Sequence, residues 1–213
     1  MNKTVTILDY GSSNLRSVAK AIETVGFTVK TVRSRAEIVA ADVLVLPGQG
    51  AFQQAMAELQ GLDVIDVIRA HIQNGKPYLG ICLGFQILFE SSSENGDHAG
   101  LGVFKGKVQH FDEVWSPEVK AKGLKVPHMG WNQLQMKRDP IGVFVDVEMP
   151  ISTYFVHSYA VFDTEHQVVS TTTEYGVPFV SSVQTASLFA SQFHPEKSGT
   201  LGLKILSSVL HQF

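Results

Sequence analysis

The chain contains a single cysteine, and the residues around it suit nucleophilic chemistry. Cys82 stands at the centre of the segment Gly80–Gly84 (GICLG), between a predicted strand and a predicted helix. Glycine two residues to either side leaves room for a sharp strand-to-helix turn that presents a nucleophile. Such a turn places the sulfur at a helix N-terminus, where the peptide dipole favours a thiolate, and aims the Leu83 N–H at a developing oxyanion. For this motif alone, the alternative is a small buried cysteine that only fills space.

A second motif supplies a base and a group that orients it. Residues 193–196 read Phe-His-Pro-Glu at the end of another predicted strand. Residues i and i+2 of an extended segment point to the same side, and Pro195 disfavours helical angles at His194. We therefore predict that Glu196 contacts one imidazole nitrogen while the other faces Cys82, as covalent catalysis requires. An ordinary His-Pro turn is the alternative, but its occurrence together with the cysteine turn favours catalysis.

A glycine-rich loop follows the buried strand expected at residues 43–46. Gly48, Gln49 and Gly50 make up this loop, and two glycines around one residue let the backbone adopt positive φ and turn an N–H inward. We assign the loop as the second wall of an oxyanion hole, although by itself it would be read as a plain Pro-Gly turn. We expect no metal and no cofactor, because the chain has no HExxH and no GxGxxG motif and no second cysteine.

The predicted secondary structure changes character half-way along the chain. The first half alternates strands at 4–9, 27–32, 43–46 and 78–81 with helices at 13–26, 51–59, 63–74 and 82–90. The second half is β-rich, with strands at 154–159, 167–172, 179–184 and 188–193, loops or insertions at 91–100 and 111–125, and a final helix capped by Ser198. Alternating elements indicate βαβ units, with the site at the carboxyl ends of the strands. We predict an α/β fold with an open, largely parallel sheet flanked by helices, flavodoxin-like, in which residues 1–213 form one domain.

The composition excludes several classes of protein. Hydrophobic residues make up 44% and charged residues 17%, which indicates a packed core rather than a disordered chain. A formal net charge of −3 gives no sign of nucleic-acid binding. One cysteine forms no internal disulfide, and the short apolar N-terminal run resembles neither a signal peptide nor a membrane span. We expect a cytoplasmic protein.

Taken together, three motifs resemble the class I (triad) glutamine amidotransferase family. They are PGQGAF at 47–52, GICLGFQ at 80–86 and QFHPEKSG at 192–199. The resemblance implies an open α/β sheet and a triad of Cys82, His194 and Glu196 that hydrolyses glutamine to glutamate and ammonia. It also implies that Gln86 contacts the substrate and that the backbone at Ser158 and Tyr159 helps to hold it.

Three further segments resemble one branch of that family, which serves histidine biosynthesis. They lie at 9–11 together with 14–18, at 127–132 (PHMGWN) and at 154–159 (YFVHSY), and the resemblance runs from near residue 5 to near residue 210. In that branch the glutaminase forms a heterodimer with a (β/α)8-barrel cyclase, which receives the ammonia and makes imidazole glycerol phosphate and aminoimidazole carboxamide ribotide. The interface positions implied by the resemblance are Asn14, Pro127, Met129, Trp131, Tyr154 and Lys197. Core packing is the alternative for Met129 and Trp131.

The sequence departs from the family pattern at a few positions, none of which removes a catalytic group. Gln49 replaces a small apolar residue in the oxyanion loop, Ser12-Ser13 replaces a more glycine-rich pair, and Phe85 replaces a common methionine. The alternatives to the histidine branch are an ammonia-channelling synthase for anthranilate, carbamoyl phosphate or guanylate, a non-catalytic flavodoxin-like module, and a cysteine peptidase. We expect weak glutaminase activity in the isolated chain, because a glycine-rich loop can rest with its N–H turned away.

Overall fold

A parallel sheet forms the centre of the computed structural model, which describes residues 4–11, 14–139, 141–145 and 147–213. Its strands lie in the order β2 (Thr28–Val32), β1 (Thr4–Leu8), β3 (Val43–Leu46), β4 (Tyr78–Ile81) and β14 (Leu188–Ser191). All four neighbouring pairs in this series are parallel. The predicted parallel sheet is therefore confirmed, and the fully buried strands β3 and β4 match the predicted segments 43–46 and 78–81.

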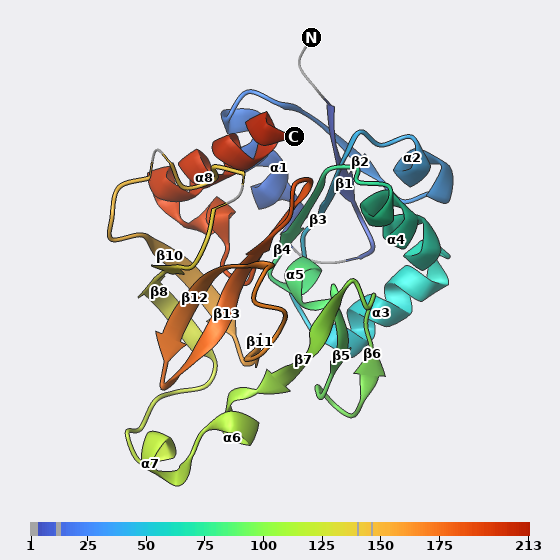
Figure 1. Ribbon diagram of the computed structural model, residues 1–213. Coiled ribbons are helices and arrows are strands. Elements are labelled where there is room, and N and C mark those ends of the chain that lie inside the picture. The colour runs from blue at the N-terminus through green and yellow to red at the C-terminus, as the bar shows by residue number, and fades with distance from the viewer. Residues whose placement is uncertain (1–3, 12–13, 140, 146) are drawn as a thin grey trace.

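Helices cover both faces of this sheet (Figure 1). On one face lie α1 (Leu15–Thr24) and α8 (Gly199–Gln212), and on the other lie α2 (Arg35–Val39), α3 (Phe52–Gly61) and α4 (Ile65–Gln73). Val18 of α1 and Ile205 of α8 belong to one buried cluster, whereas Leu59 of α3 and Ile68 of α4 belong to the other. Parallel strands need this cover on both sides, which explains their nearly continuous apolar sequences.

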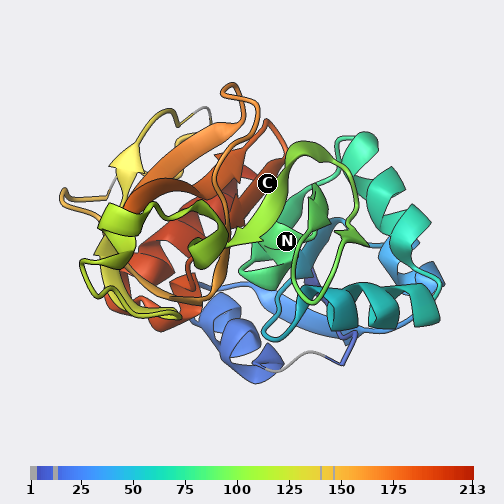
Figure 2. The same ribbon diagram turned by 90° about the horizontal axis from the view of Figure 1, so that it is seen from below.

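Beyond β14 the sheet continues with strands that are mostly antiparallel, and the second half of the chain is rich in strands, as predicted. The order continues through β13 (Val177–Gln184), β11 (Tyr159–Val161), β7 (Phe104–His110), β5 (Phe89–Ser92) and β6 (His98–Ala99). Off this path, β12 (Val169–Tyr175) pairs with β13, and β9 (Gln135–Met136) pairs with β12. A separate two-stranded sheet pairs β8 (His128–Gln133) with β10 (Ser152–His157). Figure 2, the view from below, shows these strands beside the helix-covered parallel half. In the described part of the chain, no helix has the length and apolar character needed to cross a membrane.

The secondary structure predicted for 82–90, 91–100 and 111–125 was wrong. The helix expected at 82–90 ends after one turn, α5 (Leu83–Gln86), and β5 begins at Phe89. The loop expected at 91–100 contains the end of β5 and all of β6, which pair with each other. A short apolar run fits a buried helix or a buried strand equally well, and here pairing between β5 and β7 decides for the strand.

The irregular insertion expected at 111–125 also contains regular structure. It holds the short helices α6 (Phe111–Val114) and α7 (Pro117–Lys120). Ser116 caps α7, since its side chain accepts the Val119 N–H, and Pro117 occupies the first turn. This is a recognisable helix start that the prediction overlooked. Phe111 is fully buried, so the segment is not wholly a surface feature.

Candidate active site

Cys82 lies at the tip of β4, in the sharp turn that leads into α5. Its backbone angles are φ 54° and ψ −101°, a conformation that costs free energy for any residue other than glycine. The Cys82 N–H donates to the Ser191 carbonyl at 2.7 Å, which ties the turn to β14. A side chain on Gly84 would overlap the Leu46 carbonyl oxygen, so glycine is required there for close packing. The predicted strand-to-helix turn is therefore present.

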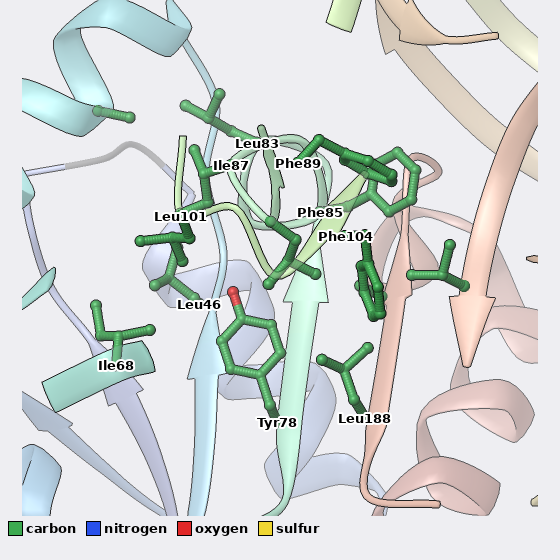
Figure 3. Close-up of a cluster of buried hydrophobic side chains, with 14 of the residues drawn as sticks. Leu46, Ile68, Tyr78, Leu83, Phe85, Ile87, Phe89, Leu101, Phe104 and Leu188 are labelled. Carbon is green, nitrogen blue, oxygen red and sulfur yellow. The ribbon is translucent and has the colours of Figure 1, made fainter. Parts of the chain in front are cut away.

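Buried side chains hold this turn from below and from the sides. The Tyr78 hydroxyl donates to the Gly84 carbonyl at 2.9 Å, and Figure 3 shows the hydroxyl of Tyr78 pointing toward α5. Leu83, Phe85 and Ile87 lie around the end of the strand and belong to the same fully packed cluster. The strained backbone at Cys82 thus persists because the packing around it leaves no alternative.

His194 and Glu196 meet where β14 leads into α8. His194 Nδ1 lies 2.8 Å from Glu196 Oε1, and the two side chains are 1% and 0% exposed. Their predicted extended geometry was only half right. His194 is extended (φ −103°, ψ 93°), but Pro195–Lys197 form a 3-10 turn that brings the carboxylate back to the ring. Proline favours the first position of such a turn, a tendency that the sequence argument did not weigh.

The surroundings of His194 favour its charged form. Burial lowers the pKa of His194, but the neighbouring Cys82 sulfur and the Glu196 carboxylate outweigh burial and raise it to about 10. Nε2 of His194 is buried and has no hydrogen-bond partner among the described residues, although the sulfur is near enough to act on the ring. Because Nδ1 of His194 is hydrogen-bonded to Glu196, Nε2 is the ring nitrogen available to the Cys82 sulfur. The structure thus brings together the three residues predicted as a triad.

Asn14 and Ser198 make contacts at the site that the sequence did not predict. Asn14, expected at a partner interface, donates from Nδ2 to Glu196 Oε1 at 2.6 Å. Ser198 stands at the start of α8, but its side chain does not cap the helix. Its hydroxyl donates to the His194 carbonyl at 2.7 Å and accepts the Tyr154 N–H at 2.9 Å. Both residues therefore brace the His194–Glu196 pair, while the Ser12-Ser13 departure lies outside the described residues.

The loop assigned to the oxyanion hole turns a carbonyl toward the site. The Leu83 N–H donates to the Gly48 carbonyl at 3.4 Å, so the loop itself occupies one of the two predicted oxyanion donors. Gly50 has the predicted positive φ of 120°. Gly48 is needed for a different reason, because a side chain there would overlap the Tyr10 hydroxyl, which donates to the Pro47 carbonyl at 2.8 Å. An open hole requires rotation of the peptide that carries this carbonyl.

A pocket of about 390 Å³ opens beside the cysteine. Its wall contains the predicted substrate residues Gln86, Ser158 and Tyr159, together with Gln49, Gly50, Cys82, Leu83, Glu94, Pro127, Tyr154, Val156, His157 and Lys197. Pockets of this size suit small molecules, and polar groups at fixed points set their orientation. The pocket therefore offers space for a small polar molecule beside the Cys82 sulfur.

Comparison with known proteins identifies the family. The model of the family "Glutamine amidotransferase class-I" matches residues 6–212. Imidazole glycerol phosphate synthase subunit HisH of Aquifex aeolicus (strain VF5) is 48% identical over 203 residues, which cover 95% of this chain and 93% of that one. The chain belongs to the HisH group of class-I glutamine amidotransferases. HisH of Syntrophotalea carbinolica is 43% identical over 204 residues, covering 96% and 98% of the two chains.

Three further matches are to one longer protein and to two more distant solved structures. Imidazole glycerol phosphate synthase hisHF, chloroplastic, of Arabidopsis thaliana is 43% identical over 97% of this HisH chain, a match that covers 34% of the plant protein. Among solved structures, PurLQS from Thermotoga maritima superposes with a TM-score of 0.73 at 19% identity, over 99% of both chains. A second structure, titled as a glutamine amidotransferase, gives a TM-score of 0.71 at 18% identity over 98% of both. These structures support the predicted fold class.

Two polar residues of this HisH chain were missed by the sequence argument. Glu94 lines the pocket, and its Oε2 accepts the Phe52 N–H at 2.6 Å, where α3 begins. Gln192 is fully buried, and its Nε2 lies 3.6 Å from Cys82 Sγ. Glu94 stands in a segment predicted as a plain loop, so no signal pointed to it. Gln192 belongs to the QFHPEKSG motif, and its position two residues before His194 was an available signal.

Five of the six expected interface residues line the pocket or lie on the strand paired with its wall. Met129 and Trp131, on β8, are 62% and 58% exposed, so their alternative as core residues is contradicted. Trp131 lies opposite Tyr154 in the β8–β10 register, and the pocket wall includes Tyr154, Pro127 and Lys197. Within the described ranges no cluster of His, Cys, Asp or Glu is arranged to hold a metal ion.

Proposed function

We propose that this HisH chain hydrolyses glutamine with Cys82 as nucleophile, His194 as acid and base, and Glu196 as the group that orients His194. The observation that supports this most strongly is the strained Cys82 at a strand tip beside a buried His194–Glu196 pair whose atoms are 2.8 Å apart. A nucleophile, a base and an orienting carboxylate in this order are what acyl transfer by covalent catalysis requires. The match over residues 6–212 supports treating residues 1–213 as one glutamine amidotransferase domain.

The reaction proceeds in two halves. The Cys82 thiolate attacks the carbon of the side-chain amide, and the negative charge moves to the carbonyl oxygen, which the N–H groups of Leu83 and the Gly48–Gly50 loop stabilise. His194, which is protonated, gives its proton to the nitrogen as the C–N bond breaks, so ammonia leaves and a thioester remains. His194 then takes a proton from water, the resulting hydroxide attacks the thioester, and glutamate leaves as the thiolate is restored.

Polar groups in the pocket suit the two ends of free glutamine. Both N–H groups of the Gln86 amide are engaged, by the Tyr159 carbonyl and by Gln192 Oε1, each at 3.0 Å. Gln86 Oε1 is therefore its available atom, and it can only accept a hydrogen bond. Together with the Glu94 carboxylate it suits the α-ammonium group, and the backbone around Ser158 and Tyr159 holds the remaining polar groups of the substrate.

We assign the partner as the cyclase subunit of imidazole glycerol phosphate synthase, a (β/α)8 barrel that forms a heterodimer with this chain in the cytoplasm. The support is the name of the HisH relatives and the exposed pair Met129 and Trp131 beside the pocket mouth. Apolar and aromatic side chains of this kind are enriched in protein interfaces. Ammonia passes from the pocket to the cyclase, which makes imidazole glycerol phosphate and aminoimidazole carboxamide ribotide. Asn14, Pro127, Tyr154 and Lys197 complete the docking surface.

The loop conformation supports regulation by that partner. The Gly48 carbonyl accepts the Leu83 N–H, which supports an oxyanion hole that is closed when the chain is alone. We propose that the cyclase with its nucleotide bound favours the rotated loop and so raises the glutaminase rate. Steady-state glutamate release, measured for the chain alone and with the cyclase and its ligand, tests this. An unchanged rate contradicts the regulation.

The role of Cys82 is tested separately in the assembled complex. Cys82→Ala should abolish synthesis from glutamine, whereas added ammonia should still support the cyclase. Loss of both activities would show that Cys82 is structural. Co-purification with the cyclase, rather than with an anthranilate, carbamoyl phosphate or guanylate synthase component, separates the histidine branch from its alternatives.

A further inference from the structure

Besides the three proposed triad residues, Gln192 contacts the Cys82 sulfur, and the proposed reaction assigns it no role. Gln192 follows β14 directly, two residues before His194, and is 0% exposed. Its backbone N–H donates to the Ser181 carbonyl at 2.9 Å, which fixes the main chain. Its Nε2 lies 3.6 Å from Cys82 Sγ, within hydrogen-bond range of sulfur. A buried amide in this position needs a partner for each of its polar atoms.

The orientation of the Gln192 amide follows from its neighbours. The Tyr159 carbonyl can only accept, so the Gln86 atom 3.0 Å from it is the donor Nε2. That same Nε2 lies 3.0 Å from Gln192, so the Gln192 atom facing it is the acceptor Oε1. The remaining atom of the Gln192 amide, Nε2, therefore faces the sulfur as a donor.

The Tyr159 carbonyl is itself fixed by a chain of donors that begins on β8. His157 Nδ1 lies 2.9 Å from this carbonyl and must donate to it. In a neutral ring His157 Nε2 then accepts, and His128 Nδ1 donates to it at 3.1 Å. His128 Nε2 accepts from Asn132 Nδ2 at 3.2 Å. Burial lowers the pKa of His128 to about 4 and that of His157 to about 3, so both rings are neutral near pH 7.

We propose that Gln192 is a further catalytic residue, whose amide N–H donates to the Cys82 sulfur in the direction imposed by Gln86 and the Tyr159 carbonyl. This rests on the proposed function, in which Cys82 is the nucleophile. The N–H stabilises negative charge on the sulfur before the attack and again when the thioester breaks and the thiolate returns. The sulfur also acts on the ring of His194, so Gln192 is a second polar group beside the nucleophile. His157 and Gln86 act as positioning residues for this contact.

The decisive measurement is the rate at which iodoacetamide alkylates Cys82 between pH 5 and pH 10, followed by mass spectrometry. The chain has one cysteine, so labelling reports this sulfur alone. Gln192→Leu removes the donor, and we expect the rate at pH 7 to fall about tenfold and the profile to move to higher pH, as for loss of a hydrogen bond to a charged group. Gln192→Glu keeps the shape but opposes the thiolate with an acceptor and a charge, so the rate should fall further.

A matched control separates this effect from general loosening of the core. Gln184 is also buried, at 1% exposure, but its amide bonds Ser170 rather than the sulfur. Gln184→Leu should leave the alkylation profile unchanged, and melting curves confirm that each variant is folded. A wild-type profile in folded Gln192→Leu, or in Gln192→Glu should the leucine variant not fold, overturns the proposal. An equal shift in Gln184→Leu overturns it too.

This measurement does not depend on glutamine turnover. If the wild-type complex released no glutamate, the proposed function would fail, while the alkylation profiles would still report whether Gln192 acts on the sulfur. In the active complex, Gln192→Leu should lower kcat with little change in KM, because Gln192 does not line the pocket. A purely structural role would leave the pH profile unmoved.

Discussion

Replacing Glu196 with glutamine tests the orienting role of that carboxylate with the smallest change in shape. Glu196 Oε1 accepts from both His194 Nδ1, at 2.8 Å, and Asn14 Nδ2, at 2.6 Å. An amide oxygen in the same place keeps the geometry but loses the charge. The amide NH2 group would take the place of Oε2, which is buried and has no partner among the described residues. A flipped amide is worse, because its N–H would face the Nδ1–H of His194 and favour the wrong tautomer.

The magnitude follows from the bond that is lost. A hydrogen bond to a charged group contributes about 1.5–3 kcal/mol, so kcat should fall about 10- to 150-fold. KM should change little, since Glu196 does not line the pocket. Glutamate release by the complex measures both quantities. Glu90→Gln is a matched control, because the exposed Glu90 side chain accepts the Gly106 N–H, away from His194. A folded Glu196→Gln enzyme with less than a twofold loss of kcat would refute the reasoning.

Three further predictions concern stability and docking. Gly84→Ala should lower the free energy of unfolding by about 1–3 kcal/mol, because the added methyl group would overlap a main-chain carbonyl. Gly61→Ala, where the methyl group would meet no neighbouring atom, should not lower it, and urea denaturation of the two variants gives the comparison. Trp131→Ala should weaken cyclase binding by about 2 kcal/mol in titration calorimetry, whereas Val39→Ala, equally exposed on α2, should have no effect. Burial lowers the pKa of His157 to about 3. Below pH 6.5 the unfolded chain therefore takes up a proton on this ring while the folded chain does not, so the free energy of unfolding falls as the pH falls. His157→Gln should flatten that decline in urea midpoints between pH 4 and pH 7, and an unchanged slope would contradict it.

Local patterns in the sequence were sufficient to predict the nucleophile turn and the parallel sheet. The continuous apolar strands and the glycines around Cys82 each express a constraint within a few residues, and the structure satisfies them. The helix α5 was predicted too long because the prediction used only such local patterns. Nothing in the run from Phe85 to Phe89 distinguishes helix from strand until β7, many residues later, pairs with β5.

The polar partners of the site were harder to predict, because their roles come from contacts between remote segments. Gln192 has meaning only once Gln86, on another element, fixes the direction of its amide. Glu94 becomes a pocket residue only because β5 carries it back to the start of α3. Asn14 was expected only at a partner interface, and its bond to Glu196, 182 positions away, was not predicted. No periodicity or motif within one segment encodes such pairings.

One hydrogen bond joins β10, which carries the proposed docking residue Tyr154, to His194, the proposed acid and base, and so gives coupling between partner and site a physical route. The His194 N–H donates to the Tyr154 carbonyl at 2.9 Å, and Tyr154 lies opposite the exposed Trp131 in the β8–β10 sheet. Ser198 joins the same two residues, through the Tyr154 N–H and the His194 carbonyl. A partner that shifts β10 must therefore move the backbone of His194 as well as act on the oxyanion loop. We expect docking to change the alkylation rate of Cys82 even where the Gly48 carbonyl stays bound to the Leu83 N–H.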